Sequence, residues 1–275
     1  MKNDEIKGTA QNSTGETPAL PNAHDAAIID QFTRQAVPFS IQQAHSKESF
    51  LNLLLEMSGV SPEDNVLDVA CGPGLVACAF AARAQHVTGI DLTPAMIARA
   101  KQIQRERQLT NLTWRIGNVL PLPFPDASFS LVITRYTFHH FIDPQAVFAE
   151  MVRVCRPNGV VLVADIALPP EKRRAFDRVE KLRDPSHTSH LTPAEFLQMA
   201  EELKLREVRT EFVKSERHLE THLQASFPNP GDDEEIRRIF REDVGKDELG
   251  LGAHWQGNEI YFAYPILILA GRKTG

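Results

Sequence analysis

The sequence contains little cysteine and no long apolar run. Three cysteines occur among 275 residues, and they form neither a C-x-x-C pair nor a Cys/His cluster with zinc spacing. We therefore expect no disulfide and no metal site, and a reduced, cytoplasmic setting fits this use of cysteine. The first residues lack the apolar segment of a signal peptide. The longest apolar run, at residues 264–271, is far too short to span a membrane.

Basic residues are not concentrated anywhere in the chain. Lys and Arg number 30 against 36 Asp and Glu, which gives a formal net charge of -6. The densest charged segment, at residues 171–184, mixes both signs and is typical of a solvated helix face. We therefore expect no nucleic-acid partner.

A single folded domain is expected after a polar start. Residues 1–25 scatter Gly, Pro, Ser and Thr without periodicity, so they predict a flexible N-terminal tail. Residues 26–275 predict one domain. We interpret the helical patterns over 26–60 as an N-terminal lid, and the looser segments at about 167–192 and 216–257 as an insertion over the substrate.

Short apolar strands alternate with helices through the middle of the chain. Parallel strands need crossover helices, so this alternation predicts a doubly wound α/β sheet. Two further strands follow toward the C-terminus and bring the number to seven. The predicted strands cover residues 65–70, 86–91, 112–117, 129–135, 159–166, 205–213 and 259–273.

A glycine-rich turn, VLDVACGPGLVA at residues 66–77, follows the first of these strands. Gly72 and Gly74 have no Cβ, so the backbone can approach a ligand closely, and the helix that follows points its N-terminus at an anion. The spacing Gly72-x-Gly74-x-x-Ala77 fits the pyrophosphate of a dinucleotide and also the carboxylate of S-adenosylmethionine. The turn alone does not decide between them.

Two carboxylates near the turn favour S-adenosylmethionine. Asp68 lies inside the strand, where a buried carboxylate needs a partner. S-adenosylmethionine carries an ammonium group that can be this partner, and NAD does not. Asp91 ends the second strand, where it can accept both hydrogen bonds of a ribose diol, as either cofactor requires.

Five segments of the chain form one recognisable set: VLDVACGPG, GIDLTPAMIARA, GNVLPLPFPDASFSLV, HHFIDPQAVFAEMVRVCRPNG and VADI. Together they resemble the class I S-adenosylmethionine-dependent methyltransferases, in the branch of ubiquinone and menaquinone biosynthesis and related small-molecule enzymes. The resemblance covers about residues 30–170. It implies a Rossmann-like, seven-stranded sheet, mostly parallel with an antiparallel last strand, and helical lid elements.

The resemblance also implies which residues bind the cofactor. Asp68 is expected near the methionine amine, Asp91 at the ribose hydroxyls and Leu92 on the adenine. Ala70 stands where many members have glycine, and Asn118 replaces a common aspartate whose role an amide oxygen can still fill. The full expected set is Asp68, Ala70, Gly72, Gly74, Asp91, Leu92, Asn118, Val119 and Arg135.

The segment RYTFHHF, residues 135–141, supplies the candidates for catalysis. Methyl transfer needs an aligned nucleophile and often a base, and histidine titrates near neutrality. Ligands in open α/β sheets lie beyond the carboxyl ends of the strands, where Asp165 ends the fifth strand. Some sugar O-methyltransferases of this branch are similar here, which favours His139 as the base and Asp165 as the group that orients it. His140 remains an alternative base. A mechanism in which neither histidine acts as the base also remains open.

Three further residues are candidates for the substrate pocket. His187 and His190 lie in the loop-like segment RDPSHTSHL, at residues 183–191. Loops over the strand ends often cover an active site. Phe39 lies in a segment that resembles the N-terminal lid of the branch, where tyrosine is frequent.

The sequence therefore predicts a metal-independent methyltransferase that uses S-adenosylmethionine. The expected acceptor is a small organic molecule, methylated on oxygen or else on carbon or nitrogen, with a histidine base. Two alternatives stay open: an NAD(P)-dependent oxidoreductase, and a cyclase or binding protein that keeps the methyltransferase fold without transferring a methyl group.

Overall fold

The computed structural model of the chain describes residues 22–44 and 48–275. Most of the expected N-terminal tail, residues 1–21, lies outside the described residues. The nine α-helices of the described part are α1 (Ala23–Ala44), α2 (Glu48–Ser58), α3 (Leu75–Ala81), α4 (Pro94–Glu106), α5 (Pro144–Val154), α6 (Pro170–Arg183), α7 (Pro193–Glu202), α8 (Leu219–Gln224) and α9 (Asp232–Asp243). A short 3-10 helix covers Phe138–His140.

One sheet runs through the molecule in the strand order β3-β2-β1-β4-β5-β8-β6, with β7 paired to β8. The first five strands in this order pair in parallel, whereas β8 is antiparallel to both of its neighbours β5 and β6. The strands are β1 (Asn65–Val69), β2 (His86–Asp91), β3 (Leu112–Ile116), β4 (Phe129–Arg135), β5 (Cys155–Ile166), β6 (Arg206–His218), β7 (His254–Gln256) and β8 (Glu259–Arg272).

The predicted α/β, Rossmann-like sheet with an antiparallel last strand is confirmed, with one strand more than expected. The addition is β7, a strand of three exposed residues that pairs back on β8. A turn through Gly257, whose φ is 61°, connects the two strands. Three exposed polar and aromatic residues show no apolar alternation, so the sequence pattern did not predict this strand.

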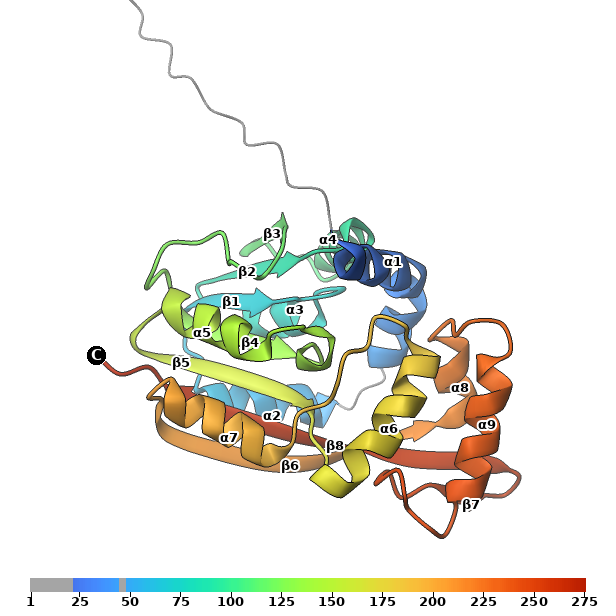
Figure 1. Cartoon of the computed structure of the whole chain (residues 1–275). Coiled ribbons are helices and arrows are strands. Elements are labelled where there is room, and N and C mark those ends of the chain that lie inside the picture. The colour runs from blue at the N-terminus through green and yellow to red at the C-terminus, as the bar shows by residue number, and fades with distance from the viewer. Residues whose placement is uncertain (1–21, 45–47) are drawn as a thin grey trace, which may run out of the picture.

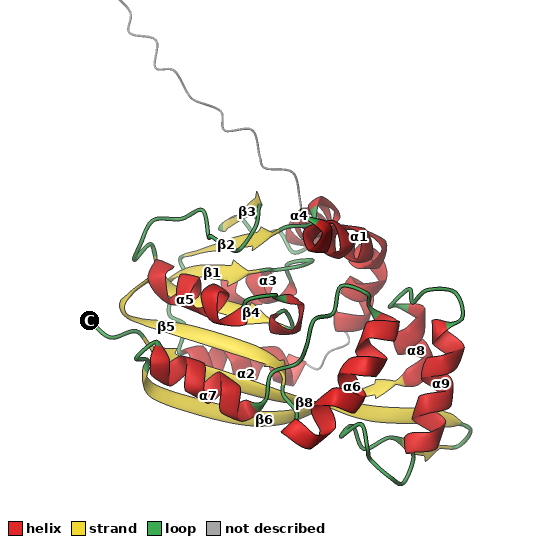
Figure 2. Ribbon diagram, in the orientation of Figure 1, coloured by secondary structure: helices red, strands yellow, loops and turns green. Residues whose placement is uncertain are grey.

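Helices cover both faces of the sheet, as crossover connections require. The helices α2, α3 and α4 pack on one face, and α5 and α7 pack on the other (Figures 1 and 2). Each face has its own apolar core, because the buried strands alternate their side chains between the two.

The remaining helices lie beyond the carboxyl ends of these strands. The helix α1 packs against α4, and α6 packs against α9 beside the far part of β8 (Figure 1). Among the described residues, no helix combines the length and the apolar character that a membrane crossing requires. The space between α1, α6 and the strand ends holds the polar side chains described next.

Candidate functional site

The turn after β1 places two glycines in different surroundings. Gly72 has φ 52°, and a Cβ added there would meet no atom within 4 Å. Gly74 has φ 75°, and a Cβ there would collide with the ring of Trp114 and lie 2.9 Å from Cβ of Ala100. Of the two, Gly72 alone lines the cavity described below. Gly74, which was expected to form the turn against the cofactor, is not among the lining residues, and its missing side chain makes room for Trp114 of β3.

Asp91 connects the end of β2 to this turn. Its Oδ2 accepts a hydrogen bond from N–H of Gly72, and its Oδ1 accepts one from N–H of Thr93, both at 2.8 Å. Burial raises the pKa of this carboxyl, and the two backbone donors oppose that rise. Each oxygen keeps a further lone pair, so the carboxylate can still accept hydrogen bonds from a diol.

Asp68 is buried within β1 and already has partners inside the protein. Its Oδ2 accepts a hydrogen bond from N–H of Ala77 at 3.0 Å, in the first turn of α3. Burial raises the pKa of Asp68 to about 7, and the nearby guanidinium of Arg135 is the main opposing effect. The partner that a buried Asp68 carboxylate needs is thus supplied within the protein, by N–H of Ala77 and by Arg135. A ligand cation beside this carboxyl would still favour its ionised form.

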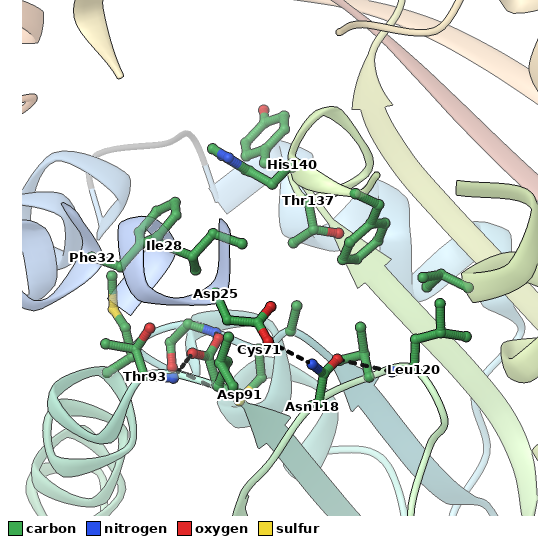
Figure 3. Close-up of a pocket in the computed structure, with 18 of the residues that line it drawn as sticks. Asp25, Ile28, Phe32, Cys71, Asp91, Thr93, Asn118, Leu120, Thr137 and His140 are labelled. Carbon is green, nitrogen blue, oxygen red and sulfur yellow. Dashed lines mark hydrogen bonds between the residues drawn. The ribbon is translucent and has the colours of Figure 1, made fainter. Parts of the chain in front are cut away.

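A cavity of about 320 Å³ lies over the turn and the strand ends (Figure 3). Most of the expected cofactor residues line it together: Asp68, Ala70, Gly72, Asp91, Leu92, Asn118, Val119 and Arg135. Ala70 adopts φ 52°, so alanine occupies here a left-handed conformation that glycine adopts without strain.

The helix α1 closes one side of this cavity with residues that the sequence analysis missed. Asp25, Ile28 and Phe32 all line it. Oδ2 of Asp25 accepts a hydrogen bond of 3.3 Å from the amide of Asn118, whose own oxygen accepts from N–H of Leu120 (Figure 3). The spacing of three and four residues puts the three α1 side chains on one helix face. This spacing is visible in the sequence and could have predicted that the three residues act together.

The residues of this cavity fit S-adenosylmethionine. Asp91 can bind a ribose diol, and the open side of Gly72 leaves room for close approach of a ligand. Leu92, Met96 and Val119 offer apolar surface for a flat ring. The buried carboxylate of Asp68 beside the turn favours an ammonium group over a pyrophosphate, because like charges repel there.

Beyond the cofactor cavity, His139 forms a pair with Asp165. The distance from Nδ1 of His139 to Oδ1 of Asp165 is 2.7 Å, and both side chains are buried. The same carboxylate accepts hydrogen bonds from N–H of Thr137, Phe138 and Ile166. Burial raises the pKa of Asp165, but the neighbouring histidine and the three backbone donors outweigh this effect and lower it, so the carboxylate is ionised and can only accept hydrogen bonds. Nδ1 of His139 must carry the proton, which leaves the lone pair on Nε2.

The two adjacent histidines differ in their electrostatics. Burial lowers the pKa of His139, but the charge and the hydrogen bond of Asp165 outweigh this effect and raise it above its usual range. Burial and the neighbouring His139 lower the pKa of His140 to about 3. Nδ1 of His140 lies 3.2 Å from both the carbonyl oxygen and Oγ of Ser186. His140 is therefore the weaker base of the two.

A second cavity, of about 50 Å³, adjoins the first. Phe32, Tyr136 and His140 line both cavities, whereas His139 lines only the second. The rings of Phe32 and His140 make an edge contact, with centroids 5.0 Å apart. The other residues of the second cavity come from distant segments: Gln35, Ile166, Glu180, Arg183, Asp184, Arg217, His222, Ala225, Ser226 and Tyr264.

The two histidines predicted to line the substrate pocket lie next to His139 but do not line the second cavity. His187 and His190 are buried, and within the described part of the chain they are not among the residues that line these two cavities. Nε2 of His187 and Nδ1 of His190 lie 2.9 and 2.8 Å from Oδ1 of Asp177. His190 stacks on the ring of His139, with centroids 5.1 Å apart.

This cluster of Asp177, His187 and His190 brings three possible metal-ligand atoms, one from each residue, within 4.8 Å of one another. The hydrogen bonds among them, with two more to Asp177 from N–H of His190 and Oγ of Ser189, already satisfy the carboxylate. The cluster packs beside the ring of His139, and among the described residues Nδ1 of His187 and Nε2 of His190 have no hydrogen-bond partner. The remaining candidate, Phe39, belongs to α1, but its side chain lies outside what the structure describes.

Comparisons with known proteins agree with this geometry. Residues 67–163 match the model of a methyltransferase domain. The uncharacterized methyltransferase YcgJ of Bacillus subtilis is 30% identical over 170 residues, which are 61% of this chain and 67% of that protein. Demethylmenaquinone methyltransferase of Tropheryma whipplei strain Twist is 30% identical over 154 residues, which are 53% of this chain and 62% of the relative.

A solved structure shares the fold. The crystal structure of YcgJ superimposes with a TM-score of 0.77 at 24% identity, over 83% of this chain and all of that one. The dinucleotide-dependent oxidoreductase is accordingly not favoured. The matched domain, the relative covered over two thirds of its length and the strand order together show that the chain belongs to the class I S-adenosylmethionine-dependent methyltransferases.

Proposed function

We propose that this enzyme methylates an oxygen atom of a small organic molecule bound in the second cavity, with His139 as the general base. The observation that carries the proposal is the 2.7 Å pair of His139 and Asp165 in a cavity that adjoins the cofactor cavity. The two cavities meet at Phe32, Tyr136 and His140. A nucleophile at this junction would be next to both the cofactor and the base.

The cofactor cavity would hold S-adenosylmethionine through its own residues. Asp91 would accept hydrogen bonds from the ribose, Leu92 and Val119 would pack on the adenine, and Asn118 would meet its edge. Asp68 would face the methionine amine. The bound cofactor supplies an electrophilic methyl group on a sulfonium ion. Apolar side chains of the cavity, such as Ile28 and Phe32, would limit the access of water to this methyl group.

His139 has the features of a base for a hydroxyl acceptor. Asp165 holds the proton on Nδ1, so Nε2 can accept the hydroxyl proton as the acceptor oxygen takes the methyl group. The carboxylate then stabilises the imidazolium that forms. Carbon and nitrogen acceptors use the same approach to the methyl group, but an acceptor that is already ionised needs no base.

The helix α1 and the segments at about 167–192 and 216–257 are proposed to act as a lid within a single domain. Side-chain amides of Gln31 and Gln35 both donate to the carbonyl oxygen of Ser226, at 2.7 and 2.9 Å. Nε2 of His24 lies 2.7 Å from the carbonyl oxygen of His140. These hydrogen bonds hold α1 against the segments that contain Ser226 and His140. The second cavity between them is small, so these bonds would have to break before an acceptor could enter.

The test is transfer of a labelled methyl group from S-adenosylmethionine to a fraction of small hydroxylated metabolites. We expect a labelled product whose methyl group lies on oxygen, as mass spectrometry or NMR of the product would show. The matched control is His139→Ala, which should bind S-adenosylhomocysteine normally and form much less product. A protein that binds the cofactor but labels no acceptor would instead be a cyclase or a binding protein on this fold.

A further inference from the structure

Among the described residues, one arginine of the second cavity has no carboxylate partner. Arg217 belongs to β6, lines the second cavity and is half-buried. Its Nη1 donates to the carbonyl oxygen of Glu216 at 3.0 Å, and its guanidinium lies 5.9 Å from the ring centroid of Tyr264. None of the ion pairs formed among residues 22–44 and 48–275 includes Arg217.

The other arginine of this cavity is fully engaged. Nε and Nη2 of Arg183 donate to both carboxylate oxygens of Glu180 at 2.7 to 3.1 Å, and both side chains are buried. Asp184 lies 4.0 Å from the same guanidinium, and its Oδ1 accepts from N–H and Oγ of Ser186. The acidic groups of the cavity are thus committed to Arg183 and Ser186. Arg217 is the guanidinium that remains for a ligand.

The charge of Arg217 acts at the junction of the two cavities. Burial raises the pKa of the Tyr136 phenol, and Arg135 and Arg217 both oppose that rise. Tyr136 lines both cavities, so it marks the place where the acceptor would meet the cofactor. A cation that favours the ionised form of this phenol would also favour ionisation of an acceptor hydroxyl beside it.

We infer that the acceptor carries an oxyanion group, a carboxylate or a phosphate, and that Arg217 binds this group while the acceptor hydroxyl faces His139. The planar guanidinium suits either oxyanion, because it can donate two parallel hydrogen bonds. The inference rests on the function proposed above, since it names the substrate class of the same cavity. It makes Arg217 a specificity-determining residue rather than part of the proton transfer.

The test compares three probes that share a phenyl ring and differ in charge: benzoate, phenyl phosphate and benzamide. Their binding to the full chain saturated with S-adenosylhomocysteine is measured by calorimetry and ligand-observed NMR. We expect the anions to bind more tightly than benzamide. Arg217→Gln should weaken the anions about tenfold to hundredfold, because a charged hydrogen bond is lost, and leave benzamide unchanged. Arg217→Lys should recover part of the affinity, since lysine keeps the positive charge but cannot donate two parallel hydrogen bonds.

Arg206→Gln is the matched control, because Arg206 lies exposed on the same strand and is not among the lining residues of either described cavity. It should keep the full affinity for all three probes. The tighter of the two anions identifies carboxylate or phosphate as the group. Equal binding of benzamide and the anions to the unaltered protein, or unchanged anion binding by Arg217→Gln, would overturn the inference. If the unaltered protein does not bind S-adenosylhomocysteine, the cofactor assignment itself is refuted.

Discussion

Nδ1 of His139 lies 2.7 Å from Oδ1 of Asp165, and this carboxylate also accepts hydrogen bonds from the backbone N–H groups of Thr137, Phe138 and Ile166. The strand end of β5 and the turn after β4 are thereby joined at one side chain. Asp165 consequently has two tasks: it orients the imidazole, and it accepts hydrogen bonds from three backbone N–H groups. A substitution at Asp165 will affect the fold as well as the reaction.

The first prediction concerns the base. His139→Ala should lower turnover about 10²–10⁴-fold, as loss of a general base does, while the affinity for S-adenosylhomocysteine stays nearly unchanged. His140→Ala is the comparison, and a smaller loss is expected because its pKa of about 3 makes it a weak base. Single-turnover methyl transfer and calorimetry provide the two measurements. Full turnover of His139→Ala on the true acceptor would remove the base assignment.

The second prediction concerns Asp165. Asp165→Asn should lower turnover, and the double variant with His139→Ala should be little slower than His139→Ala alone, because groups that act as a unit are not additive. It should also lower the stability of the fold, since an amide NH₂ cannot accept from the backbone donors. Urea unfolding of each variant separates the two effects. Additive losses in turnover would show that the residues act independently.

The third prediction concerns pH. The base must be neutral to act, and the pKa of His139 is raised above its ordinary value of about 6.5. Turnover should therefore begin to fall at a pH above this value and decrease further toward acid. Asp165→Asn removes the charge that raises the pKa, so the acid limb should move to lower pH. The ion pair stabilises the fold below the ordinary histidine pKa, and this stabilisation is lost as pH rises through the raised value.

Rate measurements with saturating acceptor from pH 5 to 9 test this dependence. A profile whose acid limb is unchanged by Asp165→Asn would show that another group titrates.

The fourth prediction concerns Asp91. Asp91→Ala should weaken S-adenosylhomocysteine binding about tenfold to hundredfold, because hydrogen bonds to a charged acceptor are lost. N–H of Gly72 and Thr93 also lose their acceptor, so the turn itself should loosen. Calorimetry measures the affinity, with exposed Glu63→Ala as the control. Equal affinities of the two variants would mean that Asp91 does not contact the ribose.

The fifth prediction separates the two glycines of the turn. Gly72→Ala should cost about 1 to 2 kcal/mol of stability, since only backbone strain opposes it. Gly74→Ala should cost about 2 to 4 kcal/mol, because the new Cβ also collides with Trp114. Trp114→Phe should restore part of the loss in Gly74→Ala and none in Gly72→Ala. Urea unfolding gives the values, and equal losses without rescue would contradict the packing role of Gly74.

Local patterns were sufficient for the sheet and for much of the cofactor cavity. The strand, turn and helix from residue 65 to 81 are continuous in sequence, and Asp91 follows at the end of the next strand, paired beside β1. Parallel neighbours end at the same edge, so their terminal residues must meet there. This is why the sequence alone could place Asp68, Gly72 and Asp91 in one site.

The second cavity could not be predicted in this way. Its walls combine Phe32 of α1, the turn after β4, Arg183 of α6 and Arg217 of β6. The loop histidines were candidates for the substrate pocket, and in the structure their rings lie against Asp177 and are not among the residues that line this cavity. Gly74 was expected to form the turn against the cofactor, and the structure adds that Trp114 occupies the space where its side chain would lie. Trp114 belongs to a strand far from Gly74 in the chain, whereas Asp177 lies only 10 and 13 residues before the two histidines, on a helix whose packing against their loop the sequence pattern does not specify.

The fold class follows from the periodicity of short segments, and the resemblance to the family and the cofactor expected at the end of β1 follow from motifs within continuous stretches of sequence. Long-range packing is needed to bring Nδ1 of His139 within 2.7 Å of Asp165, to place His140 on both cavities, and to leave Arg217 without an ion-pair partner among the described residues. Spacing within RYTFHHF says nothing about which way each imidazole points. That direction follows from partners that only the packing of β5, α6 and β6 brings within hydrogen-bonding distance.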